Sequence, residues 1–424
     1  MVARLRWGEL GLLGFPVLLL AQGVVLLALV DGASWRQAQW LPVGLFAAVM
    51  LGLHALLAWR LPRADGVLLP VAAMLSALGL LVVGRLEPAL FLRQAVWIAV
   101  GGAALAAVGL GLPSADWLAR YKYSWAALGA LLVLATFVLG VDLNGSGMRW
   151  WIGAGGVYFQ PSELFKVLLV LFLAAYLAEK RELLMLASLR AGPLRLPPLP
   201  YLLPMLGVAG LAVGLVVVQR DLGAALLFYG IFLGLLYAAT ARWDYILGGL
   251  LAFGLGAVAC YELFGHVRDR VAIWLDPWAY ADGRGYQIVQ ALIALASGGV
   301  LGSGLGYGYP EYIPAVHTDF IIAAIGEELG LLGTLAVVAL YLVLVYRGYR
   351  IALRAPSAYL QLLAAGLTTV LGLQALVILG GTTRLIPLTG ITLPFVSYGG
   401  SSLLANYLII GLLLRVSAER AYDD

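Results

Sequence analysis

The sequence is poor in charge, and this shortage excludes most soluble proteins. Only 11% of the 424 residues are charged, against about a quarter in a typical soluble domain, while 63% are hydrophobic. The mean hydropathy is +0.97. A chain this apolar cannot cover its surface with polar groups, so lipid must surround it. Basic runs and acidic tails are also missing, which leaves nucleic-acid binding without an electrostatic footprint.

Cysteine and histidine are also scarce. Cys260 is the single cysteine, which excludes an internal disulfide and a cysteine zinc site, and its apolar surroundings indicate an inert thiol. The three histidines are too scattered in sequence to suggest a metal cluster. The glycines of 302–308 follow no predicted strand, so they indicate close packing or a re-entrant turn rather than a dinucleotide loop. The small residues of 397–402 lack the flanking strand of a nucleophile elbow and favour close helix approach.

Long apolar runs are what the chain does contain. A helix needs about 20 apolar residues to cross about 30 Å of hydrocarbon. Twelve segments meet this requirement, centred on 10–30, 41–59, 67–84, 94–112, 124–140, 163–178, 202–218, 222–240, 244–264, 318–346, 358–381 and 397–415. A further apolar stretch, Gly285 to Gly306, is interrupted by glycines and predicts a re-entrant or interfacial segment. We therefore expect an all-α, polytopic membrane bundle of about 12 transmembrane helices.

The basic residues predict the orientation. With the N-terminus in the cytoplasm, 16 of the 26 Lys and Arg residues lie inside, 9 outside and 1 within a span. Both termini are therefore expected to be cytoplasmic. Arginines on the outer side are either solvated or converge on a polyanionic lipid headgroup, which suits bidentate guanidinium contacts. The arginines considered for this second role are Arg149, Arg220, Arg268, Arg270 and Arg384.

Ionisable residues inside spans are costly and are functional candidates by default. Glu163 and Lys166 are spaced i, i+3 on one helical face, which fits either a structural ion pair or a direct catalytic role. Glu327 and Glu328 lie about two turns into the tenth span, so at least one of them should face the protein interior.

Two short polar motifs lie where outer loops meet spans. Gln219-Arg220-Asp221 fits a plain interhelical turn, or a group that orients a substrate phosphate. Asp319, in His317-Thr318-Asp319-Phe320, precedes an apolar helix. A carboxylate there fits a helix cap, and it equally fits a general base or metal ligand at the membrane surface.

The polar motifs together resemble the SEDS family of cell-wall polymerases, of the RodA and FtsW type. Six blocks occur in the family's order and cover roughly residues 145–415. They are Phe159-Gln160-Pro161-Ser162-Glu163 with Lys166, Asp221-Leu222-Gly223, Trp274-Leu275-Asp276-Pro277, Gly285-Tyr286-Gln287-Ile288, His317-Thr318-Asp319-Phe320 with Gly326-Glu327-Glu328-Leu329-Gly330, and Pro387 to Ser402.

The resemblance implies a peptidoglycan glycosyltransferase that polymerises lipid II at the outer face of the cytoplasmic membrane. It implies that Asp319 is the catalytic residue, acting as base or metal ligand, and that Glu163 and Lys166 form a salt bridge in a central cavity. Substrate binding is expected from Arg220, Asp221, Arg268, Arg270, Gln287, His317, Arg384 and Ser397. A divalent cation (Mg or Mn) and a class B penicillin-binding protein, the crosslinking partner, are also expected by resemblance.

Three features depart from the family pattern. The family commonly has about ten spans, so residues 1–65 look like an added N-terminal helix pair before a polymerase core at 66–424. Arg220 stands where many members have proline, and the segment from Gly306 to His317 is short. A role in elongation and a role in division both stay open.

Two rival functions fit the same chain. A lipid II flippase would explain twelve spans, intramembrane charges and broken helices, although no inverted repeat is found and the distinctive polar blocks cluster outside. A non-catalytic scaffold for a transpeptidase would tolerate Asp319→Asn. A flippase should depend on Glu163 or Lys166 more than on Asp319.

Overall fold

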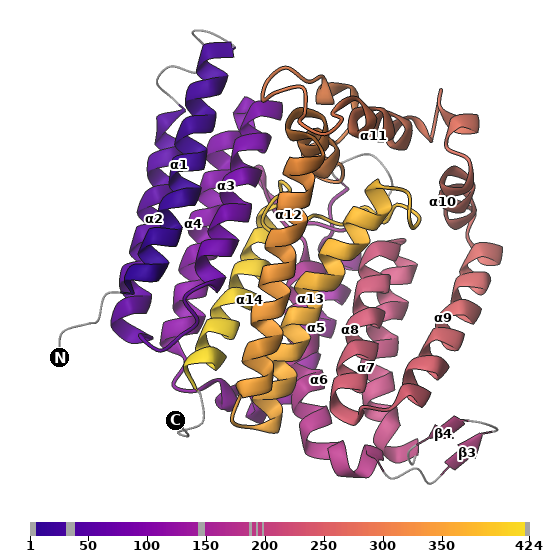
Figure 1. Ribbon diagram of the computed structural model, residues 1–424. Helices are drawn as coiled ribbons and strands as arrows, with labels where there is room; N and C mark the ends of the chain where they lie inside the picture. Colours follow the sequence, from indigo (N-terminus) through magenta and orange to yellow (C-terminus); the bar gives the residue numbers. More distant parts are fainter. Residues whose placement is uncertain are drawn as a thin grey trace. The chain divides into compact units, whose positions relative to one another are not determined.

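The computed structural model describes residues 6–30, 39–142, 149–185, 189–191, 194–196 and 199–419 (Figure 1). Parts of the predicted N-terminal addition, 1–5 and 31–38, lie outside these residues. The α-helices are α1 (Trp7–Val30), α2 (Trp40–Arg60), α3 (Leu68–Leu86), α4 (Pro88–Gly111), α5 (Lys122–Leu139), α6 (Pro161–Met185), α7 (Leu199–Val218), α8 (Leu222–Thr240), α9 (Trp243–Leu263), α10 (Gly265–Leu275), α11 (Tyr286–Ser297), α12 (Ile321–Arg354), α13 (Ala358–Thr382) and α14 (Gly400–Ala418). The 3-10 helices of the described residues are η2 (Ala115–Tyr121), η3 (Trp278–Tyr280) and η4 (Pro310–Tyr312).

The all-α membrane architecture predicted from the apolar runs is confirmed. In the described part of the chain, 11 helices are long and apolar enough to cross a membrane. The remaining predicted span, 202–218, coincides with α7, a helix of 20 residues that is not among the eleven. The glycine-interrupted stretch contains α11, whose 12 residues are too few to span a bilayer, as expected for a re-entrant or interfacial segment.

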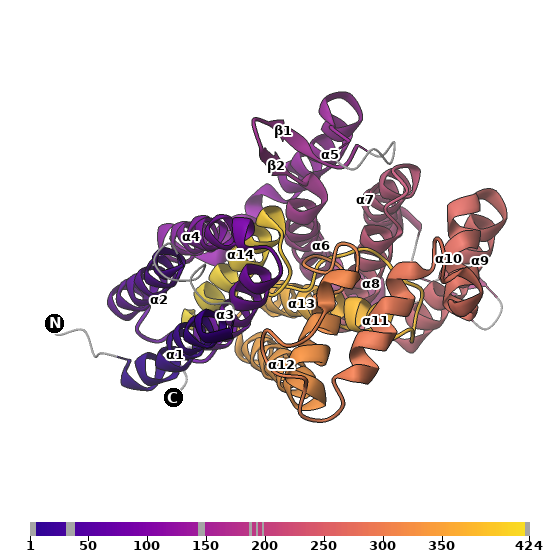
Figure 2. The ribbon, with the colours of Figure 1, turned by 90° about the horizontal axis from the view of Figure 1, so that it is seen from above.

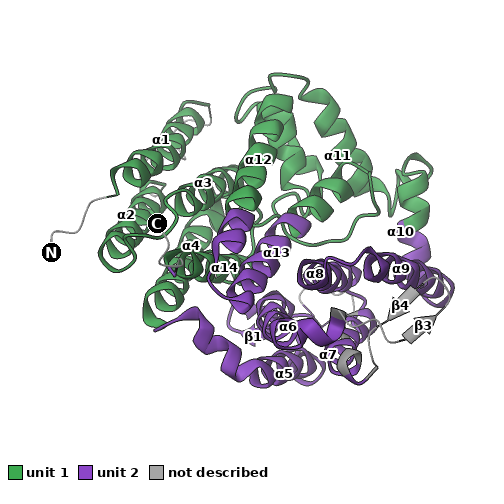
Figure 3. Ribbon diagram, turned by 60° about the horizontal axis from the view of Figure 1, so that its bottom comes forward, with its two compact units in different colours: residues 1–112, 271–347, 374–418 green, residues 113–270, 348–373, 419–424 purple. Residues whose placement is uncertain are grey.

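The chain divides into two compact units, shown in green and purple in Figure 3. Unit 1 comprises Met1–Leu112, Val271–Arg347 and Gln374–Ala418, and unit 2 comprises Pro113–Arg270, Gly348–Leu373 and Glu419–Asp424. Each unit is built from helices that are far apart in sequence.

In unit 1, α14 packs along α4, while α1 packs against α3 and α2 against α4 (Figures 1 and 2). Small residues allow the close approach of α4 and α14. A Cβ on Gly101 would lie 2.7 Å from the ring of Tyr407, and one on Gly411 would lie 2.9 Å from the carbonyl oxygen of Leu105. Such small residues are typical of helix packing in membranes, where lipid offers no hydrophobic driving force.

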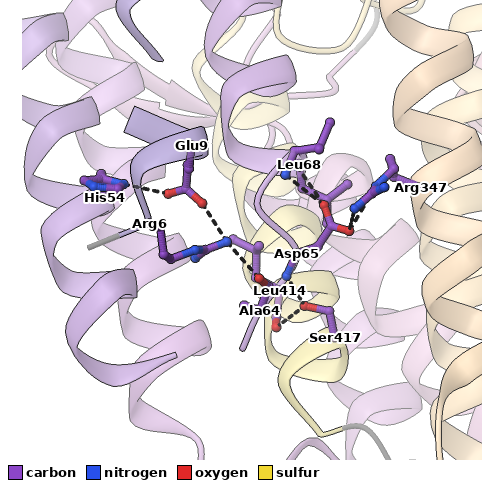
Figure 4. A network of polar contacts seen from close by, with 10 residues as sticks. Arg6, Glu9, His54, Ala64, Asp65, Leu68, Arg347, Leu414 and Ser417 are labelled. Carbon is purple, nitrogen blue, oxygen red and sulfur yellow. Dashed lines mark hydrogen bonds and ion pairs between the residues drawn. The ribbon is translucent and has the colours of Figure 1, made fainter. Parts of the chain in front are cut away.

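A polar network joins three helices of unit 1 around Asp65 (Figure 4). One carboxylate oxygen of Asp65 accepts the N–H groups of Val67 (2.9 Å) and Leu68 (3.3 Å) at the start of α3. The other oxygen accepts from Nε of Arg347 in α12 at 3.0 Å. The N–H of Asp65 donates to Oγ of Ser417 in α14 at 2.9 Å. Asp65 therefore joins the start of α3 to α12 and to the end of α14.

A second part of this network ties α1 to α2 (Figure 4). The buried carboxylate of Glu9 lies 2.6 Å from Nη2 of Arg6 and 2.9 Å from Nδ1 of His54. Arg6 also donates to the carbonyl oxygen of Ala64, in the segment before α3, at 2.8 Å. The predicted N-terminal pair is thus held together by its own charged residues.

In unit 2, α6 packs against α5 and α8, and α7 packs against α8. Phe165 and Phe228 meet edge to face, with ring centroids 5.1 Å apart, between α6 and α8. Tyr245 is the one buried residue of α9, so lipid must cover most of this helix. Two hairpins join helices: β1 (Ile152–Ala154) with β2 (Val157–Phe159), and β3 (Leu189–Ala191) with β4 (Leu194–Leu196), both antiparallel.

Candidate active site

Asp319 lies in a tight turn immediately before α12. The N–H groups of Thr318 and Asp319 donate to the carbonyl oxygen of Ala315 at 3.1 and 3.3 Å, and Ala315 adopts a left-handed φ of 54°. The carbonyl oxygen of Phe320 accepts the first hydrogen bond of the helix, from Ala323 at 2.8 Å. The half-buried Asp319 is therefore placed at the helix start by backbone contacts on both sides.

The segment 387–399 lies beside this turn and supports it. The N–H of Tyr398 donates to the carbonyl oxygen of His317 at 2.8 Å. The Ser397 hydroxyl donates to the carbonyl oxygen of Thr318 and accepts from the N–H of Leu393 at 2.9 Å. These contacts make Ser397 a support of the turn, and its predicted contact with substrate stays a prediction.

The carboxylate of Asp319 lies against the backbone of Gly390. A Cβ built on Gly390 would be 3.7 Å from Oδ2 of Asp319, and Gly390 has a φ of 73°. The proximity of Gly390 to Asp319 was not predicted. The motif that contains Gly390 was part of the family resemblance, but nothing in the sequence paired it with a carboxylate 71 positions earlier.

His317 and Gln287 lie close to the same turn. The imidazole of His317 packs edge to face on Tyr398, with centroids 5.9 Å apart. Burial lowers the pKa of His317, and the carboxylate of Glu87 acts in the opposite direction. The amide of Gln287 donates to the carbonyl oxygen of Pro314 at 3.3 Å, between α11 and the segment that leads to Asp319.

Arg384 is bound to the end of α10. Its Nε donates to the carbonyl oxygen of Trp274 and its Nη2 to that of Leu275, both at 2.9 Å. The indole N–H of Trp274 returns a hydrogen bond to the carbonyl oxygen of Arg384 at 3.1 Å. Two of the donors expected to bind substrate thus cap a helix C-terminus, a position that favours a cation.

Unit 2 contains the intramembrane pair. Nζ of Lys166 lies 2.6 Å from a carboxylate oxygen of Glu163, one turn apart on α6. The side chain of Lys166 is 1% exposed and that of Glu163 is 12% exposed. The ion pair expected from the i, i+3 spacing therefore forms, with its carboxylate the more accessible member.

Gln219-Arg220-Asp221 forms the turn between α7 and α8. Buried Asp221 caps α8, because its Oδ1 accepts the N–H of Ala224 at 3.0 Å. The Gln219 carbonyl accepts from the indole of Trp150 at 2.9 Å. Arg220 is exposed, with a left-handed φ of 61°. The turn interpretation accounts for the contacts of Gln219 and Asp221, whereas the predicted substrate contact of Arg220 stays a prediction.

His266 lies at the start of α10, near the charged groups of Arg220, Asp269 and Arg270. Burial lowers the pKa of His266, and the positive charges of Arg270 and Arg220 lower it further, while Asp269 raises it. Arg268 is exposed on the same helix. The predicted binding of a polyanionic headgroup by Arg220, Arg268 and Arg270 stays a prediction.

The predicted site residues fall into two sets. In unit 1, the turn that holds His317 and Asp319 is in contact with Ser397. Gln287 binds Pro314, just before this turn, and Arg384 lies just before the segment 387–399 that supports it. Unit 2 holds Glu163, Lys166, Arg220, Asp221, Arg268 and Arg270.

A divalent cation would depend largely on Asp319. In the described ranges, no group of three or more His, Cys, Asp or Glu residues could hold a metal ion. Mg²⁺ is commonly bound by one or two carboxylates together with substrate phosphates, so Asp319 fits an ion that arrives with a diphosphate.

Comparison with known proteins gives consistent matches. The sequence profile of the FtsW/RodA/SpoVE family, described as cell cycle protein, matches residues 59–422. The peptidoglycan glycosyltransferase RodA of Mycobacterium tuberculosis is 44% identical over 368 residues, covering 84% of this chain and 78% of that protein. The probable peptidoglycan glycosyltransferase FtsW of Geobacter metallireducens is 35% identical over 375 residues, covering 85% and 96%.

A solved structure agrees with this. A chain from a peptidoglycan synthase complex, solved to explain how polymerization and crosslinking are coordinated, superposes with a TM-score of 0.71 at 30% identity. The match covers 85% of this chain and 99% of that one. The profile match includes every candidate site residue and begins at residue 59. The N-terminal addition at 1–65 stays a prediction.

Proposed function

This chain belongs to the FtsW/RodA/SpoVE family, and we propose that it is a peptidoglycan glycosyltransferase that polymerises lipid II into glycan strands. The observation that carries the proposal is the placement of Asp319. Its half-buried carboxylate stands at the start of α12, on a turn that Ser397 and Tyr398 hold through backbone contacts. Such a fixed carboxylate suits a general base, which must hold its geometry toward the reacting group.

The chemistry assigned to Asp319 is proton removal. A sugar hydroxyl has a pKa far above 7, so it needs a base or a metal before it attacks. Asp319 takes this proton as the hydroxyl attacks the anomeric carbon and the diphosphate leaves. One displacement inverts the anomeric centre and needs one base, unlike hydrolysis by a pair of carboxylates. A divalent cation, bound by Asp319 and the diphosphate, would supply positive charge to the leaving group.

Arginines are proposed to assist the departure of the diphosphate. Arg220, Arg268 and Arg270 are the candidates, because a guanidinium group can donate two parallel N–H groups to a phosphate. A positive group near the leaving phosphate stabilises the charge that develops there. Arg384 contributes less, because two of its donors are bound to α10.

The cellular setting follows from the same reasoning. We place the chain in the cytoplasmic membrane, with both termini in the cytoplasm and Asp319 at the outer face, because this arrangement satisfies the distribution of basic residues. A class B penicillin-binding protein is the proposed partner, since glycan strands need crosslinking. Greater identity to RodA (44%) than to FtsW (35%) favours a role in elongation.

Polymerisation of labelled lipid II by the purified complex with its partner tests the proposal. Asp319→Ala is expected to lower polymer formation at least a hundredfold, with the partner's own activity blocked by a β-lactam. Asp319→Ala should keep the wild-type melting temperature within a few degrees, which separates loss of chemistry from loss of fold.

The flippase alternative predicts a different result. Equal polymer from wild type and folded Asp319→Ala would remove Asp319 as the catalyst. No polymer from either protein, together with lipid II transport that depends on Glu163 or Lys166, would favour the flippase.

A further inference from the structure

The helix that begins after Asp319 is broken nine residues after it begins. Within α12, Gly330 has φ 68° and ψ −169°, which is not helical. The break leaves the carbonyl groups before it and the N–H groups after it without their usual helical partners. Unpaired backbone groups are tolerated at membrane depth only where other protein groups satisfy them.

The glycine-rich segment 298–304 supplies these partners. The N–H groups of Ser303 and Gly304 donate to the carbonyl oxygens of Glu327 and Glu328, at 2.9 and 3.0 Å. After the break, the N–H groups of two α12 residues donate back to the same segment. These bonds run from Leu331 to Gly299 (3.0 Å) and from Leu332 to Val300 (3.2 Å). The first nine residues of α12, 321–329, therefore form a short rigid rod, with Asp319 just before one end and the segment 298–304 bound to the other.

The two glutamates beside the break hold the start of the loop that leads to Asp319. Oε1 of Glu327 accepts the N–H of Tyr309 at 3.0 Å. Glu328 lies 3.4 Å from Nε of Arg85 in α3, and Nη2 of Arg85 contacts the carbonyl oxygen of Gly308 at 3.4 Å. Both carboxylates thus act on residues 308 and 309, directly or through Arg85.

The loop 308–320 is consequently attached at both ends to one nine-residue rod. Three of its apolar side chains are buried, since Ile313 is 2% exposed, Val316 6% and Phe320, at the end of the loop, 0%. A movement of residue 309 away from Glu327 would be transmitted along a short, packed loop to the turn that holds Asp319.

Burying the carboxylate of Glu327 costs free energy of folding, which indicates that this residue has a role beyond stabilising the fold. The residue is 8% exposed, and its Oε2 has no hydrogen-bond partner in the described part of the chain. A buried carboxylate with an unsatisfied oxygen is destabilising, and each such group requires an explanation. The adjacent carboxylate of Glu328 is also buried and repels that of Glu327. Among the described residues, Arg85 is the one cation that forms an ion pair with either carboxylate, and it pairs with Glu328.

We propose that Glu327 is a positioning residue for Asp319, which it fixes by holding the main-chain N–H of Tyr309 and so the loop 308–320. The inference rests on the proposed function, because it takes Asp319 as the catalytic base. Glu328 and Arg85 form a second anchor of the same loop at Gly308. The role assigned to Glu327 is exerted through the geometry of the loop and does not require a contact with substrate.

The test compares Glu327→Gln and Glu327→Ala in the full chain with its partner, using lipid II polymerisation. Glutamine keeps an oxygen that accepts the Tyr309 N–H, so kcat is expected within about threefold of wild type. Alanine removes the acceptor and is expected to lower kcat about tenfold, with KM for lipid II changed less than twofold. Glu311→Ala is the matched control, because this exposed carboxylate lies in the same loop and should leave kcat unchanged.

Hydrogen–deuterium exchange over 308–320 supplies a readout that does not depend on turnover. Exchange is expected to rise in Glu327→Ala and to stay at the wild-type level in Glu327→Gln and Glu311→Ala. A fall in kcat without faster exchange, faster exchange without a fall in kcat, or equal loss in both Glu327 variants would each overturn the positioning role. An active Asp319→Ala variant would instead contradict the proposed role of Asp319 as catalyst. This result is obtained with a different variant, so it can be distinguished from the three outcomes above.

Discussion

At the scale of single residues, His317 should make the free energy of unfolding depend on pH. Burial lowers its pKa below the usual 6.5, so the unfolded chain takes up a proton at a higher pH than the folded chain. The free energy of unfolding should then decrease as the pH falls through about 6.5 and should be insensitive to this histidine above that value. His266, whose pKa is also lowered, acts in the same direction.

The melting temperature is therefore expected to fall between pH 7.5 and pH 5.5, and to fall less in His317→Gln. Thermal unfolding of the detergent-purified protein at both pH values measures this, with His266→Gln and the double variant alongside. The fall in melting temperature between the two pH values should be smaller in each single variant and smallest in the double variant. An unchanged slope in His317→Gln would show that this imidazole is not shielded in the folded chain.

At the scale of elements, the pairing of 298–304 with broken α12 depends on glycines that leave no room for a Cβ, and Gly302 is one of them. Gly302 has φ 85°, and a Cβ there would lie 2.2 Å from the carbonyl oxygen of Glu328 and 2.7 Å from the N atom of Gly330. Gly302→Ala must displace backbone on both sides and is expected to reduce polymerisation more than tenfold, with a clear loss of melting temperature.

Gly299 provides the matched control for this element. It also has a positive φ, of 54°, but a Cβ there would meet nothing within 4 Å. Gly299→Ala should therefore cost only the backbone strain, about 1–2 kcal/mol, and keep most of the activity. Equal effects of the two substitutions on melting temperature and polymer yield would show that strain, rather than contact with α12, dominates at this segment.

The elements differ in how well the sequence predicts them. The spans were predictable because a membrane requires long apolar runs, and the ion pair of Glu163 and Lys166 follows from their helical spacing. The break in α12 at Gly330 was not predictable from the sequence. It depends on a segment about 30 residues earlier, which supplies the hydrogen bonds that the broken helix lacks. Arg384 was expected to bind substrate, yet its bonds to Trp274 and Leu275 arise from a contact 110 positions away that no local pattern encodes.

At the scale of the whole molecule, the N-terminal helix pair is the part whose removal the fold should tolerate. The contact of Glu9 with His54 lies entirely within the pair, and Arg6 donates to the carbonyl oxygen of Ala64, in the segment between α2 and α3. Against α3, the pair contributes apolar packing, with Gly23 close to Leu81. Lipid tails are as apolar as leucine, so lipid can replace this cover at small cost in hydrophobic free energy, although close packing is lost.

A chain that begins at residue 59, where the family match starts, is therefore expected to keep at least half of the polymerisation rate. Its melting temperature should fall by several degrees, because the packing of α1 on α3 and of α2 on α4 is lost. Lipid II polymerisation and thermal unfolding of the full and shortened chains, each with the partner, measure both effects. A shortened chain that folds but makes no polymer would mean that α1 and α2 are needed for catalysis. Their contribution would then be more than apolar packing, because lipid can replace apolar packing.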